Sequence, residues 1–407
     1  MTSDRIVLMI GATGKVGRHV AAGLLEEGAR VRALVRHPLT AGLPGEVSVT
    51  KGDLKRPETV ATAAEDADAA FLLWPGFSAA GASQVVTELA RHVSHVVYLS
   101  AARLQHGDEG PMEGVWSEVE ALIEASGVGW TFVRAGGFAA NTLEWADQIR
   151  AGDTVRIPSP NAARSLVHER DIADVAVRAL VDPALVGRAF AVTGPEVLTQ
   201  IEQVRAIGAA IGSELRVEEQ PADLARREYE AVMGAEFADR AIAYWATLVD
   251  APERATGDVE GVTGRPARTF AQWARDHADD FVRRSTAELA DAYATGFRSG
   301  RIDHATRLLA PDFVRVAPQE TDGREVELRG IAAVMENAER QTARAKINAV
   351  EVGGPLVNQD QFAIRFSFDE TDRASGRSQT TTKVSLYTAR AGRIVREEVF
   401  YYTPPPP

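Results

Sequence analysis

The chain has 407 residues, too many for one ordinary hydrophobic core, so two domains are expected. Its formal net charge of −12 argues against broad binding to nucleic acid or to an anionic membrane, because those polyanions would repel it. It has no cysteine, which excludes disulfides, thiol catalysis and metal held by cysteine, and its 8 histidines are scattered without the spacing of metal ligands, so no metal site is predicted.

No apolar run reaches the ~18 residues needed to span a bilayer. The first residues lead directly into an apolar run, without the basic and hydrophobic regions of a signal peptide. We therefore expect a soluble cytoplasmic protein. The basic residues are nearly all arginine, which we interpret as a codon bias; the lysines are Lys15, Lys51, Lys55, Lys346 and Lys383.

The first part of the chain alternates strand-like and helix-like segments. Strands are predicted at 6–10, 31–35, 47–49, 69–74, 96–99 and 130–133. Helical patterns lie between them, at Val16, Val20 and Leu24 and over 58–64, 83–90 and 115–125. Continuous apolar strands separated by helices predict an α/β domain with a doubly wound parallel sheet of the Rossmann type.

The segments that follow extend this domain. A helix over 168–183 is predicted with Asp171 as its cap. A strand and a helix follow over 188–212, and residues 221–250 have a helical pattern. Residues 250–269 are rich in Gly, Pro and Thr and are a loop or linker candidate. A last helix ends near Arg284, so we place the domains at 1–283 and 284–407.

The second domain has a different texture. Two helices are predicted, over 285–298 and 302–309, and the chain is strand-rich from Asp312 onward. Ile364, Phe366 and Phe368 alternate with polar residues, so one face of the sheet is buried and the other is polar. Helices followed by long strands predict an α+β cone with a curved antiparallel sheet, and the four terminal prolines an extended end.

Three glycines join the first strand to the first helix. Gly11, Gly14 and Gly17 form a G-x-x-G-x-x-G turn, where glycine permits a positive φ or a close backbone approach. The start of the helix then offers free N–H groups and a positive dipole end to a pyrophosphate. In this strand–turn–helix frame the motif predicts a dinucleotide site, and a tight structural turn without ligand is the alternative.

The end of the second strand indicates which dinucleotide is bound. An NAD site commonly has an acidic residue there for the ribose 2′-hydroxyl. This chain has Arg36, with Arg32 on the same strand, and a guanidinium suits a 2′-phosphate. NADP(H) is therefore favoured, unless Arg36 is only a solvated strand end. Asp53 follows the third strand, either at the adenine edge of the site or as a turn residue.

Several motifs in order resemble the NmrA-like branch of the atypical short-chain dehydrogenases/reductases, over about residues 5–282. The stretches that carry the resemblance are "GATGKVG", "ALVRHP", "KGDL", "FLLWP", "VVYLSA", "SGVGWTFVRAGGFAANT" and "SLVHERDIADVAVRAL". The resemblance implies that the pyrophosphate is held by Gly11, Thr13, Gly14, Val16 and Gly17. It implies Arg36 at the 2′-phosphate, and Asp53 and Leu54 at the adenine. It further implies Leu73, Trp74 and Pro75 at the ribose, and Ser100 with Gly136, Gly137 and Phe138 near the nicotinamide.

The chain departs from the wider superfamily at the acid–base pair. Reductases of that superfamily use Tyr-x-x-x-Lys, in which the tyrosine donates a proton. Trp116 occupies the acid position here and Glu120 the lysine position, and an indole N–H is not a usable acid. Ser100 and His168 are the residual candidates for a proton donor. Alternatively, His168 only starts a helix and Ser100 only ends its strand.

The C-terminal part, about residues 285–403, resembles the SnoaL-like branch of the nuclear-transport-factor-like superfamily. The supporting stretches are "LADAYATGFRSGRIDHATRLLAPDFVRVAP", "VELRGIAAVMENAE" and "GRIVREEVFYYTP". The candidates for its pocket are Tyr293, Asp312, Glu320, Glu397 and Tyr401. A buried carboxylate among them would have a raised pKa and act as a base, whereas surface charge over an aromatic core is the alternative. The resemblance also implies a homodimer formed through the sheet.

Together these observations predict an NADPH-dependent oxidoreductase that transfers hydride to a conjugated carbonyl, a quinone or an imine. The cone would assist a cyclisation or isomerisation, as suits secondary metabolism. Two alternatives stay open. The protein is a non-catalytic NAD(P)-binding redox sensor or regulator, or the cone performs redox-neutral chemistry while the first domain is a scaffold.

Overall fold

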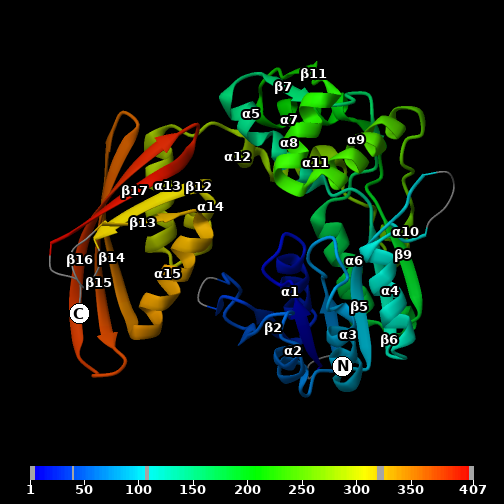
Figure 1. Cartoon of the computed structure of the whole chain (residues 1–407), viewed down its shortest axis with the longest axis horizontal. Helices are drawn as coiled ribbons and strands as arrows, with labels where there is room; N and C mark the ends of the chain where they lie inside the picture. Colours follow the sequence, from blue (N-terminus) through cyan, green and yellow to red (C-terminus); the bar gives the residue numbers. More distant parts are fainter. Residues whose placement is uncertain (1–4, 39–40, 106–109, 319–324, 403–407) are drawn as a thin grey trace. The chain divides into compact units, whose positions relative to one another are not determined.

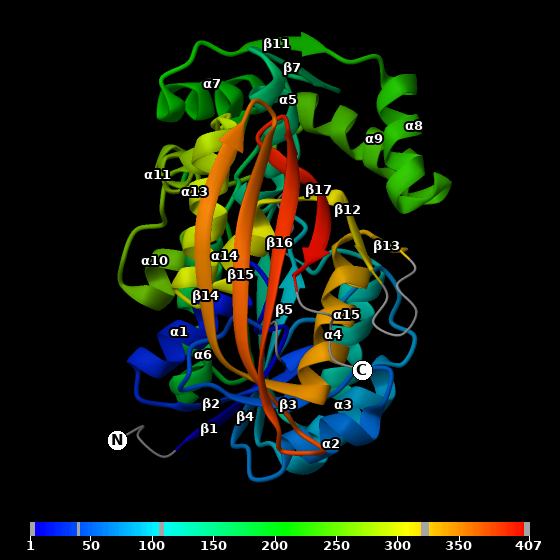
Figure 2. The same cartoon turned by 90° about the vertical axis from the view of Figure 1, so that its left-hand side faces the viewer.

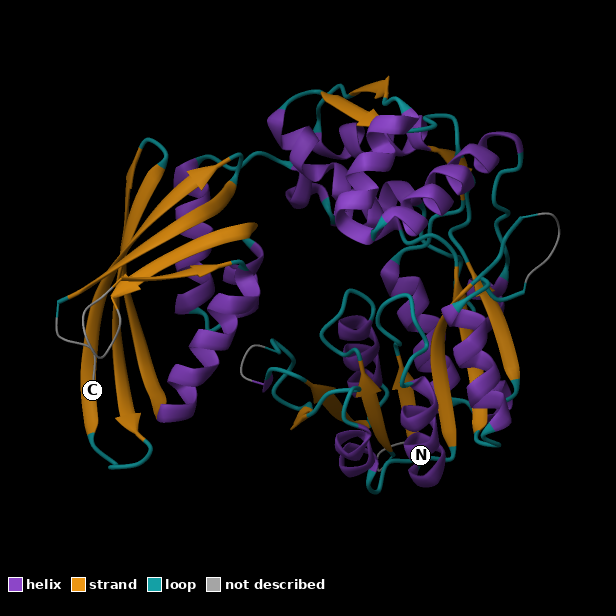
Figure 3. Ribbon diagram, viewed as in Figure 1, coloured by secondary structure: helices purple, strands orange, loops and turns teal. Residues whose placement is uncertain are grey.

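The computed structural model describes residues 5–38, 41–105, 110–318 and 325–402 (Figure 1, Figure 3). One compact unit comprises the described residues up to Pro38 together with Leu43–Phe281. The chain from Val282 onward belongs to a second unit. Within the described ranges, no helix has both the length and the apolarity that a bilayer crossing requires.

A seven-stranded parallel sheet forms the frame of the first unit. Its strand order is β3-β2-β1-β4-β5-β6-β9. The strands are β1 (Ile6–Ile10), β2 (Arg30–Val35), β3 (Ser48–Lys51), β4 (Ala69–Leu72), β5 (His95–Ala101), β6 (Gly129–Ala135) and β9 (Arg188–Val192). All neighbouring pairs run parallel, which confirms the doubly wound fold predicted from the alternating pattern.

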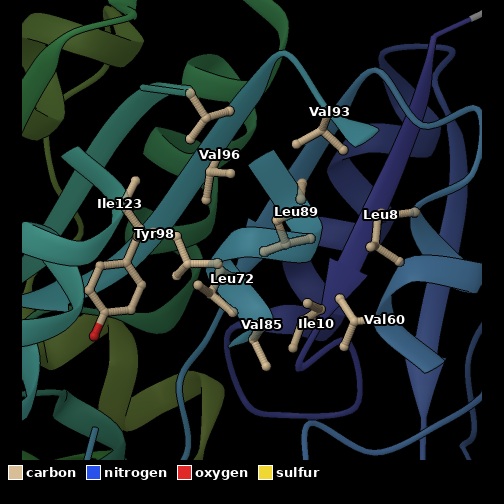
Figure 4. Close-up of a cluster of buried hydrophobic side chains, with 14 of the residues drawn as sticks. Leu8, Ile10, Val60, Leu72, Val85, Leu89, Val93, Val96, Tyr98 and Ile123 are labelled. Atoms are coloured by element: carbon tan, nitrogen blue, oxygen red, sulfur yellow. The ribbon is translucent and has the colours of Figure 1, made fainter. Parts of the chain in front are cut away.

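Helices cover both faces of this sheet. On one face lie α2 (Pro57–Ala64), α3 (Ala82–His92) and α4 (Val115–Ala125). Their apolar side chains pack with alternate strand residues such as Leu8, Ile10 and Leu72 (Figure 4). The intervening residues Val7 and Met9 are equally buried, on the face where α1 (Gly17–Glu26) and α6 (Glu169–Val181) pack together. Burial on both faces explains the continuous apolar strands.

A smaller, mostly helical region follows β6. It contains two short strand pairs, β7 (Thr154–Ile157) with β11 (Arg216–Glu219) and β8 (Ala163–Arg164) with β10 (Leu198–Thr199). Its helices are η2 (Ala139–Trp145), α5 (Ala146–Ala151), α7 (Gln200–Ile211), α8 (Ala222–Met233), α9 (Ala235–Asp250), α11 (Phe270–Asp276) and α12 (Ala278–Phe281). Trp273 is fully buried at the centre of the apolar cluster of this region.

One local expectation in this unit is wrong, and another holds only in its loop alternative. The cap of α6 is His168, whose side chain accepts the N–H of Arg170, whereas Asp171 lies inside the first turn and is bound by Arg268. The segment 250–269 is no linker between the units: it contains α10 (Asp258–Thr263), and Asp258 accepts the N–H of Ala191 at 2.7 Å. Local composition resembled a linker because the contacts that order this segment come from distant residues.

The second unit is a curved sheet covered by helices, as the α+β cone predicts. The strand order is β13-β12-β17-β16-β15-β14. The strands are β12 (Leu309–Pro318), β13 (Glu325–Arg329), β14 (Ala345–Asn358), β15 (Gln361–Asp372), β16 (Ser378–Arg390) and β17 (Arg393–Tyr401), and the curvature is plain in Figure 2. The helices are α13 (Thr286–Arg298), α14 (Ile302–Arg307) and α15 (Ile331–Arg344).

The sequence reading of this unit needs two corrections. The sheet is antiparallel except for β12 and β17, which pair in parallel. The strand-rich reading from Asp312 onward also missed α15, whose cluster-facing residues include Val334 and Met335. The helix α15 begins directly after Gly330 and packs against the sheet. Its amphipathic pattern therefore interrupts the alternating pattern of the strands.

Candidate functional site

The predicted cofactor residues gather at one edge of the first sheet. Gly11 follows β1, Arg36 follows β2, Leu73 follows β4 and Gly136 follows β6, while Ser100 is the penultimate residue of β5. Because these strands are parallel, their carboxyl ends meet at the same edge. The strand order reverses between β1 and β4, where ligands bind in open α/β sheets.

The glycine turn is shaped so that side chains are excluded from it. Gly11 has φ 95°, and a Cβ there would lie 2.9 Å from the Cβ of Leu73. A Cβ at Gly17 would lie 2.0 Å from the carbonyl oxygen of Gly11, so only glycine lets α1 start this close to β1. Gly14 donates its N–H to the same oxygen at 3.0 Å and closes the turn.

The turn leaves donors free at the start of α1. Within the described part of the chain, no backbone hydrogen bond engages the N–H groups of Thr13, Lys15 or Val16. The α1 helix dipole adds positive potential at the same place. Arg18 donates to the carbonyl of Thr13 at 3.0 Å and braces the turn. The arrangement is a cradle for an anion, as the pyrophosphate prediction requires.

The two arginines of β2 have different surroundings. Arg32 donates to the carbonyl oxygens of Ala63 and Glu65, at the end of α2, so its guanidinium is occupied. Arg36 is exposed, and none of the described residues pairs with it. Of the two, Arg36 is the one placed to receive a phosphate at this edge.

The residues after β3 and β4 surround the same edge. Oδ1 of Asp53 accepts the N–H of Lys55 at 3.0 Å, so Asp53 is a turn residue, as the alternative interpretation of the sequence proposed. Its second carboxylate oxygen does not take part in this bond. Leu54 and Trp74 pack partly buried against the apolar cluster, and Trp74 donates to Ser78 at 2.8 Å. Pro75 is exposed.

Ser100 is the polar group of this edge that lacks a partner. It is 3% exposed, and its hydroxyl finds no hydrogen-bond partner among the described residues. Such a group normally costs about 1–3 kcal/mol unless a ligand or water satisfies it. Across from it, the loop of Gly136 to Phe138 is held by Val167, whose N–H donates to the Gly137 carbonyl at 2.8 Å. The orphaned hydroxyl and the glycine cradle both fit a bound dinucleotide.

The positions of the missing acid–base pair are filled by packing and by an ion pair. Trp116 is partly buried in the apolar cluster and meets Phe77 edge-on, with ring centroids 6.2 Å apart. Glu120 is 4% exposed and binds Arg134 with both oxygens, at 3.0 Å and 2.7 Å. Both residues join α4 to its surroundings, and neither offers a proton to a substrate.

His168 is unsuited to donate a proton. It is 1% exposed, its Nδ1 accepts from Arg170, and its Nε2 lies 3.3 Å from Asp276. Burial lowers the pKa of His168 despite the neighbouring carboxylates of Glu169 and Asp276. The ring is therefore neutral and locked, and the helix-entry alternative describes what it does.

Sequence reasoning missed two cations beside this edge. Lys15, inside the glycine turn, donates to the carbonyl of Ala140 at 3.0 Å and so ties the turn to η2. Arg164 lies so close that a Cβ on Gly137 would meet its Cζ at 2.6 Å. Glu253 holds Arg164 at 2.7 Å. The rarity of lysine in this chain is a sequence feature that could have identified Lys15, whereas no sequence feature identifies Arg164.

The C-terminal candidates separate into buried and exposed groups. Tyr293 and Glu397 are each 5% exposed, Tyr401 is partly buried, and Asp312 is exposed, so the surface alternative holds for Asp312. Glu320 lies outside the described residues. The expected base is not found: burial by itself raises the pKa of Glu397, but Arg315 and Lys383 outweigh it and leave that pKa below its ordinary value.

Comparison with known proteins agrees with both halves of the chain. A family model described as NAD(P)H-binding matches residues 11–183, and one described as a SnoaL-like domain matches residues 290–397. The chain is 36% identical over 287 residues, 68% of this chain and 99% of the relative, to the (4-alkanoyl-5-oxo-2,5-dihydrofuran-3-yl)methyl phosphate reductase of Streptomyces griseus. It is 31% identical over 287 residues, again 68% and 99%, to the NAD(P)H azoreductase of Xenophilus azovorans.

A solved structure shares the fold of the first unit. The crystal structure of an NADPH-dependent quinone oxidoreductase from Escherichia coli, complexed with NADPH, aligns with a TM-score of 0.57 at 17% identity. The alignment covers 66% of this chain and 99% of that chain. At this identity the likeness concerns the fold alone.

Proposed function

Since this chain belongs to the NAD(P)H-binding, NmrA-like branch of the atypical short-chain dehydrogenases/reductases and carries a SnoaL-like domain, we propose that it is a reductase that uses NADPH. Its acceptor is a conjugated carbonyl, a quinone or an imine. The observation that carries the proposal is the buried, unpartnered hydroxyl of Ser100 at the carboxyl edge of the sheet, beside a glycine cradle.

Different residues of this edge would hold different parts of the cofactor. The N–H groups of Thr13, Lys15 and Val16 would hold the pyrophosphate. Arg36 would bind the 2′-phosphate, which supports NADPH over NADH. Ser100 and the Gly136–Phe138 loop would lie at the nicotinamide end. When bound, NADPH supplies a hydride, and the loop and hydroxyl orient the acceptor toward it.

The choice of acceptor follows from what the edge lacks. Trp116, Glu120 and His168 are each occupied by packing, an ion pair or a helix cap, so none of the predicted side chains is a strong proton donor. A conjugated acceptor spreads the charge that hydride addition creates, and it needs less help from an acid. The name of the Streptomyces griseus relative describes such an acceptor, an unsaturated lactone.

The SnoaL-like domain adds a second, redox-neutral step in this proposal, a cyclisation or isomerisation of the reduced product, as in secondary metabolism.

We also propose a cytoplasmic homodimer that forms through the outer face of the sheet of the SnoaL-like domain. Phe400 and Leu356, on strands β17 and β14, are 55% and 76% exposed, which favours such a contact.

The first test is turnover. NADPH binding is measured by nicotinamide fluorescence, and its oxidation is then followed by absorbance while enones, quinones and imines are added. We expect binding, and oxidation with at least one acceptor of these classes. Tight binding without turnover across the panel would favour the redox-sensor alternative. Turnover of a neutral isomerisation without NADPH would favour the cone-centred alternative.

The second test is cofactor choice. Arg36→Ala removes a charged contact to the 2′-phosphate that is worth about 1.5–3 kcal/mol, so we expect NADPH to bind about 10- to 100-fold more weakly. NADH binding stays unchanged because it lacks that phosphate. Arg30→Ala is the matched control, since Arg30 is an exposed residue at the opposite end of β2. Equal weakening of both cofactors would contradict the role of Arg36.

A further inference from the structure

Two cations lie among apolar side chains on the helix-covered face of the second sheet. Arg315 of β12 has a side chain 9% exposed, and Lys383 of β16 has one 11% exposed. They share one carboxylate, Glu397 of β17, at 3.5 Å from Arg315 and 3.9 Å from Lys383. This cluster of Arg315, Lys383 and Glu397 therefore carries an excess positive charge inside the domain.

One oxygen of this carboxylate already accepts hydrogen bonds from two neutral donors. Ser385 donates to Oε1 of Glu397 at 2.7 Å, and Tyr387 donates to the same oxygen at 3.2 Å. Ser385 and Tyr387 are 0% and 1% exposed, so these bonds are shielded from water. Two residues of the neighbouring strand β16 thus hold Glu397 in place, so its carboxylate does not move closer to either cation.

Both cations lie at ion-pair distance from Glu397 but make no hydrogen bond to it. Every N–H of an ammonium or a guanidinium is a donor. Within the part of the chain that the structure describes, Lys383 makes no hydrogen bond, and the buried Nε of Arg315 has no hydrogen-bond partner. Buried charges are ordinarily hydrogen-bonded as well as paired, because desolvation is costly. The cluster therefore has unused donor capacity for an anion.

The surroundings of Lys383 are apolar but not sealed. Its ammonium lies 5.4 Å from the ring centroid of Phe366 and 5.5 Å from that of Phe368. Tyr401, opposite Lys383 in the β16–β17 pairing, is partly exposed. A ligand that reaches Lys383 from this side would meet a cation beside aromatic faces. Burial and the charge of Arg315 lower the pKa of Lys383 to about 8, so an anion would also favour its protonated form.

We propose that Lys383 and Arg315 bind the anionic group of a small organic molecule, a carboxylate or a phosphate monoester with an aromatic or alkyl body. The apolar part lies against the partly exposed Phe368, and the oxygens take the N–H groups that the domain leaves unused. This role for the pair goes beyond the reductase reaction, and it does not depend on NADPH.

Binding of benzoate, phenyl phosphate and neutral benzamide to the full chain tests the proposal by calorimetry. NADP⁺ is kept in excess so that the glycine cradle is occupied. We expect at least one of the two anions to bind tenfold or more tightly than benzamide. Binding of benzoate alone identifies a carboxylate site, and binding of phenyl phosphate alone a phosphate site. Equal binding of benzamide, or no binding of either anion at millimolar concentration, would overturn the proposal.

Two lysine variants locate the binding. Lys383→Met should weaken the anion tenfold or more, whereas Lys346→Met, at an exposed lysine of β14, should change it less than twofold. Binding that survives Lys383→Met lies elsewhere and contradicts the proposal.

A melting curve separates binding from a structural role. Arg315 remains to neutralise Glu397 in Lys383→Met, so the variant should melt at the same or a higher temperature than the parent. A variant that unfolds would show that Lys383 serves the fold and would equally overturn the proposal.

Discussion

At residue scale, Glu120 forms an ion pair at the position where the family resemblance predicts a lysine. Its side chain is 5% exposed and faces Arg134, whose side chain is 18% exposed. The bidentate geometry joins α4 to β6. Reading the sequence showed that the lysine is absent but could not name the partner, because Arg134 is fourteen residues away on another element.

The loss of one member of such a buried pair should destabilise the protein more than the loss of both. We expect Glu120→Ala to reduce the free energy of unfolding by about 3–5 kcal/mol, because it removes the buried carboxylate that two nitrogens of Arg134 bind. The double variant Glu120→Leu with Arg134→Met should recover most of that loss. Urea unfolding followed by tryptophan fluorescence measures both.

The control for this pair is Glu118→Ala, at an exposed residue of the same helix, which should stay within about 0.5 kcal/mol of the parent. If the double variant were as unstable as Glu120→Ala, the two side chains would contribute by packing and not as a pair.

At element scale, the start of α6 and the end of α11 are joined by buried titratable groups. His277 lies 2.6 Å from Glu169 and 3.0 Å from Asp280, and Trp273 donates to Glu169 at 3.0 Å. Burial alone would lower the pKa of His277, but the hydrogen bonds to Asp280 and Glu169 outweigh it and raise the pKa to about 9. His277 is thus charged in the folded protein at neutral pH.

This pairing makes the stability of the first unit depend on pH. The folded pKa of His277 lies above the unfolded value of 6.5, so its contribution is complete below pH 6.5 and is lost as the pH rises toward about 9. We expect a loss on the order of 2 kcal/mol over that interval. Denaturant midpoints measured by tryptophan fluorescence from pH 6 to pH 9.5 should show it.

His277→Gln should be less stable than the parent at pH 6.5 and should have a flatter pH dependence above it. His92→Gln, at an exposed residue of α3, should keep the slope of the parent. An unchanged slope in His277→Gln would assign the pH dependence to other groups.

At the scale of the whole molecule, the two units have separate cores and contain different aromatic residues. All 6 tryptophans lie before Phe281, in the first unit. The second core is built from phenylalanine and tyrosine, such as Phe362, Phe366 and Tyr387. Fluorescence of tryptophan therefore reports on the first unit alone, whereas far-ultraviolet circular dichroism reports on both.

Separate cores should unfold in separate transitions. NADPH binds the folded first unit only, so at one hundred times its Kd it should stabilise that unit by about 2.7 kcal/mol. We expect the tryptophan-detected transition to shift upward and the transition seen only by circular dichroism to stay in place. A single transition that shifts as a whole would show that the two units unfold together.

Several features could be read from the sequence because they depend on neighbouring residues. The strand over Ile6–Ile10 and the helix over Val115–Ala125 were predicted with the bounds the structure has. The glycine turn was equally plain, since Gly11 and Gly17 exclude side chains for reasons set within one strand–turn–helix unit. Periodicity and turn chemistry act over a few residues, and a single chain displays them fully.

Tertiary structure decided what depends on distant partners. The cap of α6 and the neutrality of His168, the ion pair of Glu120, and the lowered pKa of Glu397 each rest on residues brought together by folding. Electrostatics and desolvation act through space, so a carboxylate that reads as a candidate base becomes an ion-pair member once cations are packed beside it. The sequence by itself determined the cofactor-binding frame and the two-domain plan, and the packed structure alone decided which polar groups remain available for ligands.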